Sequence, residues 1–199
     1  VRTRPVPVIT ETARIIEIDP GNYDILYPQS GTFESPAVYR CSKGVATFSY
    51  IDMHDKKWVY IDGLTVVNTD PGGKGIKMNG AENCVVKNCS ISAVYGIVAY
   101  KPGVTNCWFS DNVITGVCEW TNEAMGAHGD NIGEGIQITG PGNVICYNKV
   151  SGFRDCISTM EDQHAVNQYS IDIHNNDIYV GVDDAIEAAS RIDDDFYVP

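Results

Sequence analysis

Apolar residues recur along this chain in runs too short for helices. In the stretch 133–160 (GEGIQITGPGNVICYNKVSGFRDCISTM), short apolar runs at 136–138, 144–146 and 156–159 are each bounded by Gly, Asn or Asp. Such runs are typical of strands separated by tight turns. The same unit recurs before and after this stretch, so the pattern predicts a repeat structure.

The isoleucines that open the first strand of each unit give the register of the repeat. They follow one another at intervals of roughly 20 to 40 residues, the range of one solenoid coil with or without an inserted loop: Ile76, Ile97, Ile136, Ile157 and Ile186. Neighbouring positions alternate between apolar and polar, as a strand with one buried face requires. We therefore expect these isoleucines to stack in a single file.

Asparagines recur at a second position of the repeat. Asn112, Asn148 and Asn176 share one register, which Leu64 and Cys89 occupy in the earlier units. Stacked at an inward bend, side-chain amides can bond to the coils above and below and so satisfy their donors and acceptors. The sequence thus predicts an asparagine ladder.

A unit of this length cannot bury its apolar face alone, and stacking of coils would create a continuous core. The pattern over 13–188, including the opening IIEIDPGNYDI at 15–25, resembles the right-handed parallel β-helix repeat proteins of the pectate-lyase-like group. The resemblance implies an all-β fold, a right-handed parallel β-helix (solenoid) of roughly five to seven coils in one domain. Residues 1–57 would form the N-terminal strands and first coils. Residues 58–199 would form the regular coils, with a long loop at 115–132 and an acidic C-terminal tail.

The chain is acidic, with a formal net charge of −12 over 199 residues. This charge argues against nucleic acid as a partner, because a binder must neutralise phosphates. No apolar run approaches the ~20 residues that span a bilayer, so no membrane span is expected. The opening VRTRPVPVIT is not a signal peptide. We nevertheless expect a secreted or extracytoplasmic protein whose signal lies outside this sequence.

The seven cysteines are an odd number, and Cys84 and Cys107 fall at one repeat position. Their apolar surroundings favour small buried hydrophobes stacked coil on coil. No CxxC or HxxxH spacing indicates a structural zinc site. Disulfides between adjacent coils stay open at this point, because spacing alone does not establish pairing.

One column of the repeat carries candidate chemistry. Two residues before each anchoring isoleucine stand Lys74, Tyr95, Glu134, Asp155 and Asp184. Carboxylates on neighbouring strands, ~5 Å apart, repel one another, so at least one pKa should be raised unless a cation lies among them. Oxygen-rich groups of this kind suit Ca²⁺, the cofactor we expect, and the candidate ligands are Glu134, Asp155, Asp183 and Asp184. The alternative is that these acids are solvated turn residues.

The resemblance also implies catalytic roles. In pectate-lyase-like enzymes Ca²⁺ neutralises a uronate carboxylate while a nearby Arg or Lys takes the adjacent proton. By that resemblance Arg154 is the first candidate base and Lys77 the second. A hydrolytic alternative uses Glu134 with Asp155 or Asp184 as an acid–base pair.

Outward positions of the same strands and the inserted loop supply candidate substrate contacts. Tyr100 offers a ring face and a hydroxyl, which suit a sugar ring. Long insertions in compact repeats are usually functional or disordered. The candidate substrate-binding residues are Tyr100, Gln137, Trp120, His128 and Glu187.

Two function classes follow. The first is a carbohydrate-active, lyase-like protein that acts on or binds an acidic polysaccharide. The second is a non-catalytic structural or self-assembling β-solenoid. Neither terminus shows an amphipathic helix that would cover an end coil, so we also expect self-association through the solenoid ends.

Overall fold

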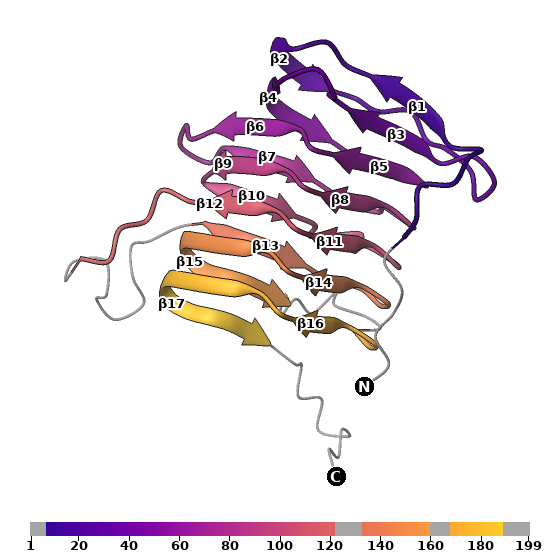
Figure 1. The fold of residues 1–199 in the computed structure, drawn as a ribbon. Coiled ribbons are helices and arrows are strands. Elements are labelled where there is room, and N and C mark those ends of the chain that lie inside the picture. The colour runs from indigo at the N-terminus through magenta and orange to yellow at the C-terminus, as the bar shows by residue number, and fades with distance from the viewer. Residues whose placement is uncertain (1–6, 122–132, 160–167, 189–199) are drawn as a thin grey trace.

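The regular structure of the protein, analysed as a computed structural model, consists of β-strands. The structure describes residues 7–121, 133–159 and 168–188, and these contain no helix. Parallel strands build a β-solenoid of about six turns, which confirms the expected fold class (Figure 1). Within the described ranges, no segment is a helix long and apolar enough to cross a membrane.

Two parallel sheets run along the solenoid axis. The seven-stranded sheet has the order β1 (Arg14–Glu17), β3 (Ala37–Arg40), β5 (Val59–Asp62), β8 (Val85–Lys87), β11 (Trp108–Ser110), β14 (Val144–Cys146) and β16 (Asp172–His174). The ten-stranded sheet comprises β2 (Gly21–Leu26), β4 (Ala46–Asp52), β6 (Thr65–Asn68), β7 (Lys74–Lys77), β9 (Ser90–Ala93), β10 (Tyr95–Val98), β12 (Val113–Thr115), β13 (Glu134–Ile138), β15 (Lys149–Thr159) and β17 (Asp177–Ala188).

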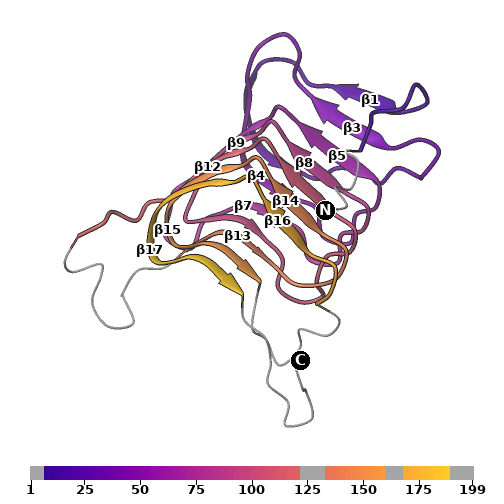
Figure 2. The same cartoon turned by 60° about the horizontal axis from the view of Figure 1, so that its bottom comes forward.

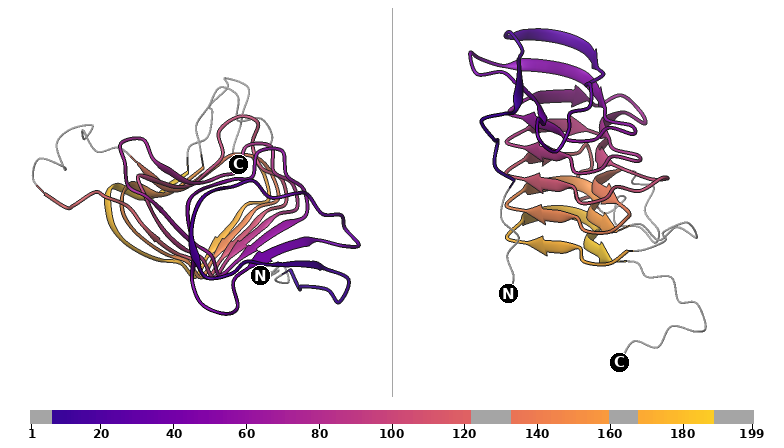
Figure 3. Two further views of the ribbon diagram at one scale, coloured as in Figure 1. Left: turned by 90° about the horizontal axis from the view of Figure 1, so that it is seen from above. Right: turned by 90° about the vertical axis from the view of Figure 1, so that its right-hand side faces the viewer.

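Each middle coil passes through three strands in turn, for example β8, β9 and β10. In the last coils the second and third strands merge into the long bent strands β15 and β17 (Figure 2). Seen from above, the strands of successive coils lie over one another (Figure 3). The paired strand residues therefore have counterparts directly above or below them.

The isoleucine file is confirmed. Ile76, Ile97, Ile136, Ile157 and Ile186 are consecutive register partners, and Ile51 of β4 extends the file by one coil. All are fully buried except Ile186, which is 46% exposed on the last coil. Burying each such side chain contributes about 2 kcal/mol, so the file is a main source of core stability.

The asparagine ladder is also confirmed, at the bend between the two sheets. Asn112 Nδ2 donates to Asn148 Oδ1 at 2.9 Å, and Asn148 Nδ2 donates to Asn176 Oδ1 at 3.0 Å. The backbone nitrogen of Cys89, one coil earlier, donates to Asn112 Oδ1. The side-chain oxygen of each asparagine thus accepts hydrogen bonds from the preceding coil.

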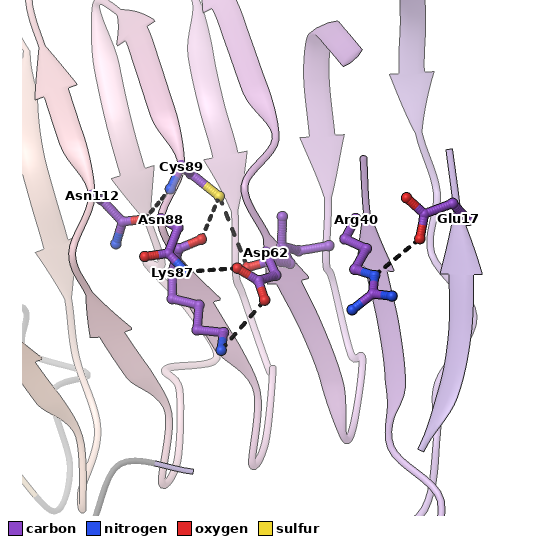
Figure 4. Close-up of polar contacts among 8 residues, drawn as sticks. Glu17, Arg40, Asp62, Lys87, Asn88, Cys89 and Asn112 are labelled. Carbon is purple, nitrogen blue, oxygen red and sulfur yellow. Dashed lines mark hydrogen bonds and ion pairs between the residues drawn. The ribbon is translucent and has the colours of Figure 1, made fainter. Parts of the chain in front are cut away.

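The outer side of the seven-stranded sheet carries two columns that sequence reasoning missed. One is a second apolar cluster at outward positions, packed by Ile9 and Ala13: Val38, Tyr60, Val85, Trp108, Val144 and Cys146. The other alternates in charge through the register partners Glu17, Arg40, Asp62 and Lys87. Arg40 Nε lies 3.0 Å from Glu17 Oε2, and Lys87 Nζ lies 3.3 Å from Asp62 Oδ2 (Figure 4). Opposite charges on adjacent strands stabilise the pairing, whereas like charges would oppose it.

Candidate functional site

A corner in the backbone decides which way the acidic column points. A side chain at Gly135 would enter the core, because its Cβ would lie 2.5 Å from Val150 Cγ1 and 3.1 Å from Phe153 Cδ2. Gly96, one coil earlier, has the same orientation toward Ile114. Ile136, the next residue, also faces the core, so the alternation of the strand is broken at Gly135, and Glu134 lies on the outward side, where the charge of Glu187 acts on it. The inward glycines therefore present this column on the outside of the coils.

Glu134 and Asp155 are register partners on β13 and β15, and Asp155 pairs in turn with Asp184 of β17. The column predicted from sequence therefore exists. Glu134 is only 8% exposed and Asp155 only 2% exposed, although both are directed outward. Glu134 Oε2 is buried without a hydrogen-bond partner. The alternative of fully solvated turn acids is thus wrong for these two residues.

Burial and mutual repulsion change the protonation of this pair. Burial, and then the negative charges of Asp155 and Glu187, raise the pKa of Glu134 to about 8. Burial also raises the pKa of Asp155, although a hydrogen bond from the Asp184 backbone and the charge of Arg154 oppose the change. Glu134 is therefore largely protonated at neutral pH, while Asp155 is the acid of the pair that ionises first.

Arg154 lies beside the pair but is already engaged. Its Nη2 and Nε lie 3.1 Å and 3.2 Å from Asp183 Oδ2, and Nε lies 3.7 Å from Asp155 Oδ2. The hydrogen bond to Asp183, partly offset by burial, raises the pKa of Arg154. A guanidinium stabilised in this way is a poor proton acceptor, which weakens the interpretation of Arg154 as a base.

Asp184 and Asp183 differ from the buried pair, since both are exposed. The backbone nitrogen of Asp184 donates to Asp155 Oδ1 at 3.0 Å. The register shifts between Phe153 and Asp155, so the last coil meets the column with irregular pairing. Asp184 therefore orients Asp155 through its main chain.

The four expected Ca²⁺ ligands do not form a ready cation site. Within the described ranges, no group of three or more His, Cys, Asp or Glu side chains is arranged to hold a metal ion. The Asp155 oxygens face the Asp184 amide and Arg154, and Asp183 is bound by Arg154. Calcium requires six to eight oxygen ligands, and a protonated Glu134 is a weak one. The donor set therefore does not fit the ion, and no step proposed below uses it.

The outward column next to the pair follows the expected register through Lys77, Val98, Gln137, Ser158 and Glu187. Gln137 Oε1 is buried without a partner. Ser158 Oγ donates to Glu187 Oε2 at 3.1 Å, which holds one of the charges that act on Glu134. The sequence pattern alone does not indicate Ser158 as a site residue, although its register beside Gln137 is a signal that could identify it. Lys77 stands two coils from Gln137, so it does not join the carboxyl pair.

The remaining candidates are dispersed. Burial, followed by the charges of Tyr95 and Glu134, raises the pKa of Tyr100 to about 12, so this phenol lies within electrostatic reach of the pair. Trp120 is 64% exposed in the segment after β12. His128 lies outside the described residues. The site that the structure supports is thus Glu134 and Asp155, with Arg154, Gln137 and Ser158 around them.

Comparisons of the chain with protein-family models, with curated proteins and with solved structures find no match.

Proposed function

We propose that this protein is a carbohydrate-active β-solenoid that acts on an acidic polysaccharide through the carboxyl pair Glu134 and Asp155. The observation that carries the proposal is the pairing of two buried carboxyl groups, Glu134 and Asp155, on adjacent strands, where burial and repulsion raise the pKa of Glu134 to about 8. Two carboxyl groups whose environments separate their protonation states are the usual basis of acid–base assignment.

Each residue then has a defined role. Glu134, protonated at neutral pH, donates a proton to the oxygen of the departing sugar. Asp155, ionised and oriented by the Asp184 amide, accepts a proton from the attacking water or from the sugar ring. Arg154, whose side chain is 41% exposed, supplies the positive charge that a uronate carboxylate requires. Gln137 offers its unpartnered carbonyl oxygen to a sugar hydroxyl.

The test is incubation of the purified chain with pectate, alginate and chondroitin. Released reducing ends report hydrolysis, and absorbance of unsaturated products reports elimination. Replacing Glu134 with Gln or Asp155 with Asn should lower either rate by about 100-fold or more, the usual contribution of a general acid or base. Glu82→Gln is the matched control, because Glu82 is a half-buried glutamate that pairs with Lys57 elsewhere on the solenoid. Absence of both signals across the panel would remove the catalytic proposal.

The second candidate is a non-catalytic structural solenoid, and one observation favours it. Asp155 is 2% exposed, so a substrate could reach it only if the chain around it moved. In this case Glu134→Gln would alter stability without altering any reaction, and the wild type would bind or assemble without cleaving.

A further inference from the structure

Two cysteines stack directly on one another inside the solenoid. Trp108 of β11 is the register partner of Val85 of β8, and the Trp108 backbone nitrogen donates to the Cys84 carbonyl oxygen at 2.9 Å. Cys84 and Cys107, the residues just before this pair, are therefore neighbours on adjacent coils. Both side chains belong to the main core, with exposures of 0% and 1%.

The placement of this pair suits a covalent bond. Neighbouring positions on paired strands are about 4.8 Å apart. This value lies within the Cα separation of about 4.4–6.8 Å that disulfides span. Both side chains point to the same side of the coil, toward the core. The two thiols are near enough for each to shift the pKa of the other.

We propose that Cys84 and Cys107 close into a disulfide that fastens two middle coils of the solenoid under oxidising conditions. In the structure both thiols are free. The sequence left this pairing open, and the strand register now selects it. The inference is independent of the carboxyl pair and of any activity.

The surroundings of the two thiols give them different pKa values, which decides which one attacks first. Burial acts to raise the pKa of Cys84, but hydrogen bonds from the Cys107 thiol and from backbone groups leave it lowered. Burial and the neighbouring Cys84 sulfur raise the pKa of Cys107. Cys84 is thus the better thiolate and the first nucleophile of the pair.

The oxidant is a small-molecule disulfide such as oxidised glutathione. The Cys84 thiolate attacks one of its sulfurs, forms a mixed disulfide and releases one thiolate. Cys107 then attacks the Cys84 sulfur, the S–S bond to the small molecule breaks, and the Cys107 proton passes to the second departing thiolate. The two cysteines are oxidised by two electrons, and one small disulfide is reduced to two thiols. Because both residues are buried, the exchange takes place while the chain folds or while the coils open.

Cys89 provides a matched control on the same coil as Cys84. It is a core cysteine with 2% exposure, but its neighbours on the adjacent coils are Leu64 and Asn112. Its backbone nitrogen bonds to Asn112 Oδ1, as Figure 4 shows. Cys89 therefore shares the burial of the pair and lacks a stacked thiol.

The experiment refolds the full chain from denaturant and reductant into a buffer of reduced and oxidised glutathione, then returns it to denaturant without reductant and alkylates the remaining thiols there. We expect two thiols to escape alkylation, a mass loss of about 2 Da before alkylation, and a fragment that joins Cys84 to Cys107. The melting temperature should rise by about 5–12 °C over the reduced protein, the shift that a loop of this size implies. Cys107→Val should abolish the cross-link, and Cys89→Val should retain it.

Valine is chosen because Val59, one coil before Cys84, already occupies the column of the two cysteines. The variant therefore keeps an apolar side chain in this column. If Cys107→Val does not fold, Cys84→Val serves instead. The fragment map of the wild type shows which two cysteines are joined, so it tests the proposal without any variant. A refolded wild type with native circular dichroism and both residues alkylated would overturn the proposal. A bridge from Cys84 to any other cysteine would do the same.

Discussion

Glu134 and Asp155 lie opposite one another on β13 and β15, point away from the core, and are nevertheless almost entirely withdrawn from water. The same column carries Lys74 and Tyr95 on the earlier coils, where the Lys74 ammonium lies 5.7 Å from the Tyr95 ring centroid. The column thus changes from a cation and an aromatic ring to two acids along the solenoid axis. The two carboxyl groups with raised pKa values therefore lie where β13 pairs with β15.

The first prediction concerns stability against pH. The pKa of Glu134 is about 8 in the folded protein, against about 4.3 in an unfolded chain. An acid whose pKa is raised by folding contributes stability that is fully present below about pH 4 and is lost as the pH rises through 8. The reason is that between these two pH values the folded state holds the proton and the unfolded state does not. Wild type should therefore lose about 1 kcal/mol per pH unit relative to Glu134→Gln between pH 5 and 8. Urea unfolding at several pH values measures this difference, and parallel curves for the two proteins would contradict the raised pKa.

A second prediction addresses calcium. The Asp155 and Asp183 oxygens are already used by Arg154 and the Asp184 amide. We therefore expect millimolar Ca²⁺ to shift the melting temperature by less than about 1 °C at pH 7, since a ligand stabilises only in proportion to its binding. Differential scanning fluorimetry with Mg²⁺ as control measures the shift. A larger rise that disappears in Asp155→Asn would show that these side chains rearrange around the cation.

A third prediction tests the asparagine ladder. Asn148 is 1% exposed, receives the Asn112 amide at 2.9 Å, and donates to the Phe109 carbonyl oxygen at 3.0 Å. Asn148→Ala should cost roughly 2–4 kcal/mol of unfolding free energy, because it leaves buried donors and acceptors unpaired on neighbouring coils. Asn22→Ala, an exposed site on β2, should change it by less than about 0.5 kcal/mol. Equal effects of the two substitutions in urea melts would argue against the ladder as a source of stability.

A fourth prediction concerns self-association, which we propose from the exposure of Ile186 on the last described coil. Ile186 ends the isoleucine file and is 46% exposed on β17. Unpaired strands with exposed apolar residues favour association. Wild type should sediment above the monomer mass in a concentration-dependent way, and Ile186→Lys should shift it toward monomer. Val113→Lys is the control, because Val113 is also 46% exposed but lies on the side of the stack. A wild type that remains monomeric at all concentrations would end this proposal.

The fold could be predicted because equivalent positions of successive coils carry the same type of side chain, which reveals the strand register. Ile136 and Ile157 are apolar at one repeat position, and Asn112 and Asn148 are amides at another, so the stacking partners follow from the order of residues. A coil that must share its core with its neighbours needs the same kind of residue at the same place in each turn. The acidic column was predictable for the same reason.

The sequence predicted that at least one carboxyl group of the column has a raised pKa, but not which one, nor which side chains Arg154 binds. The order of residues places Glu134 beside Asp155, but only the packing shows that both are withdrawn from water and that Arg154 is held by Asp183. The pKa of a carboxyl group depends on the water and charges around it in three dimensions, which no repeat pattern specifies.

By itself, then, the sequence determined the winding of the chain and the partners in each stack, because periodic apolar and amide positions are the physical requirement of a solenoid. The tertiary structure decided which stacked groups meet water, which of the two acids holds its proton, and that Cys84 and Cys107 face the core from adjacent coils. These properties arise from contacts between side chains on different coils, and such contacts exist only once the coils are assembled.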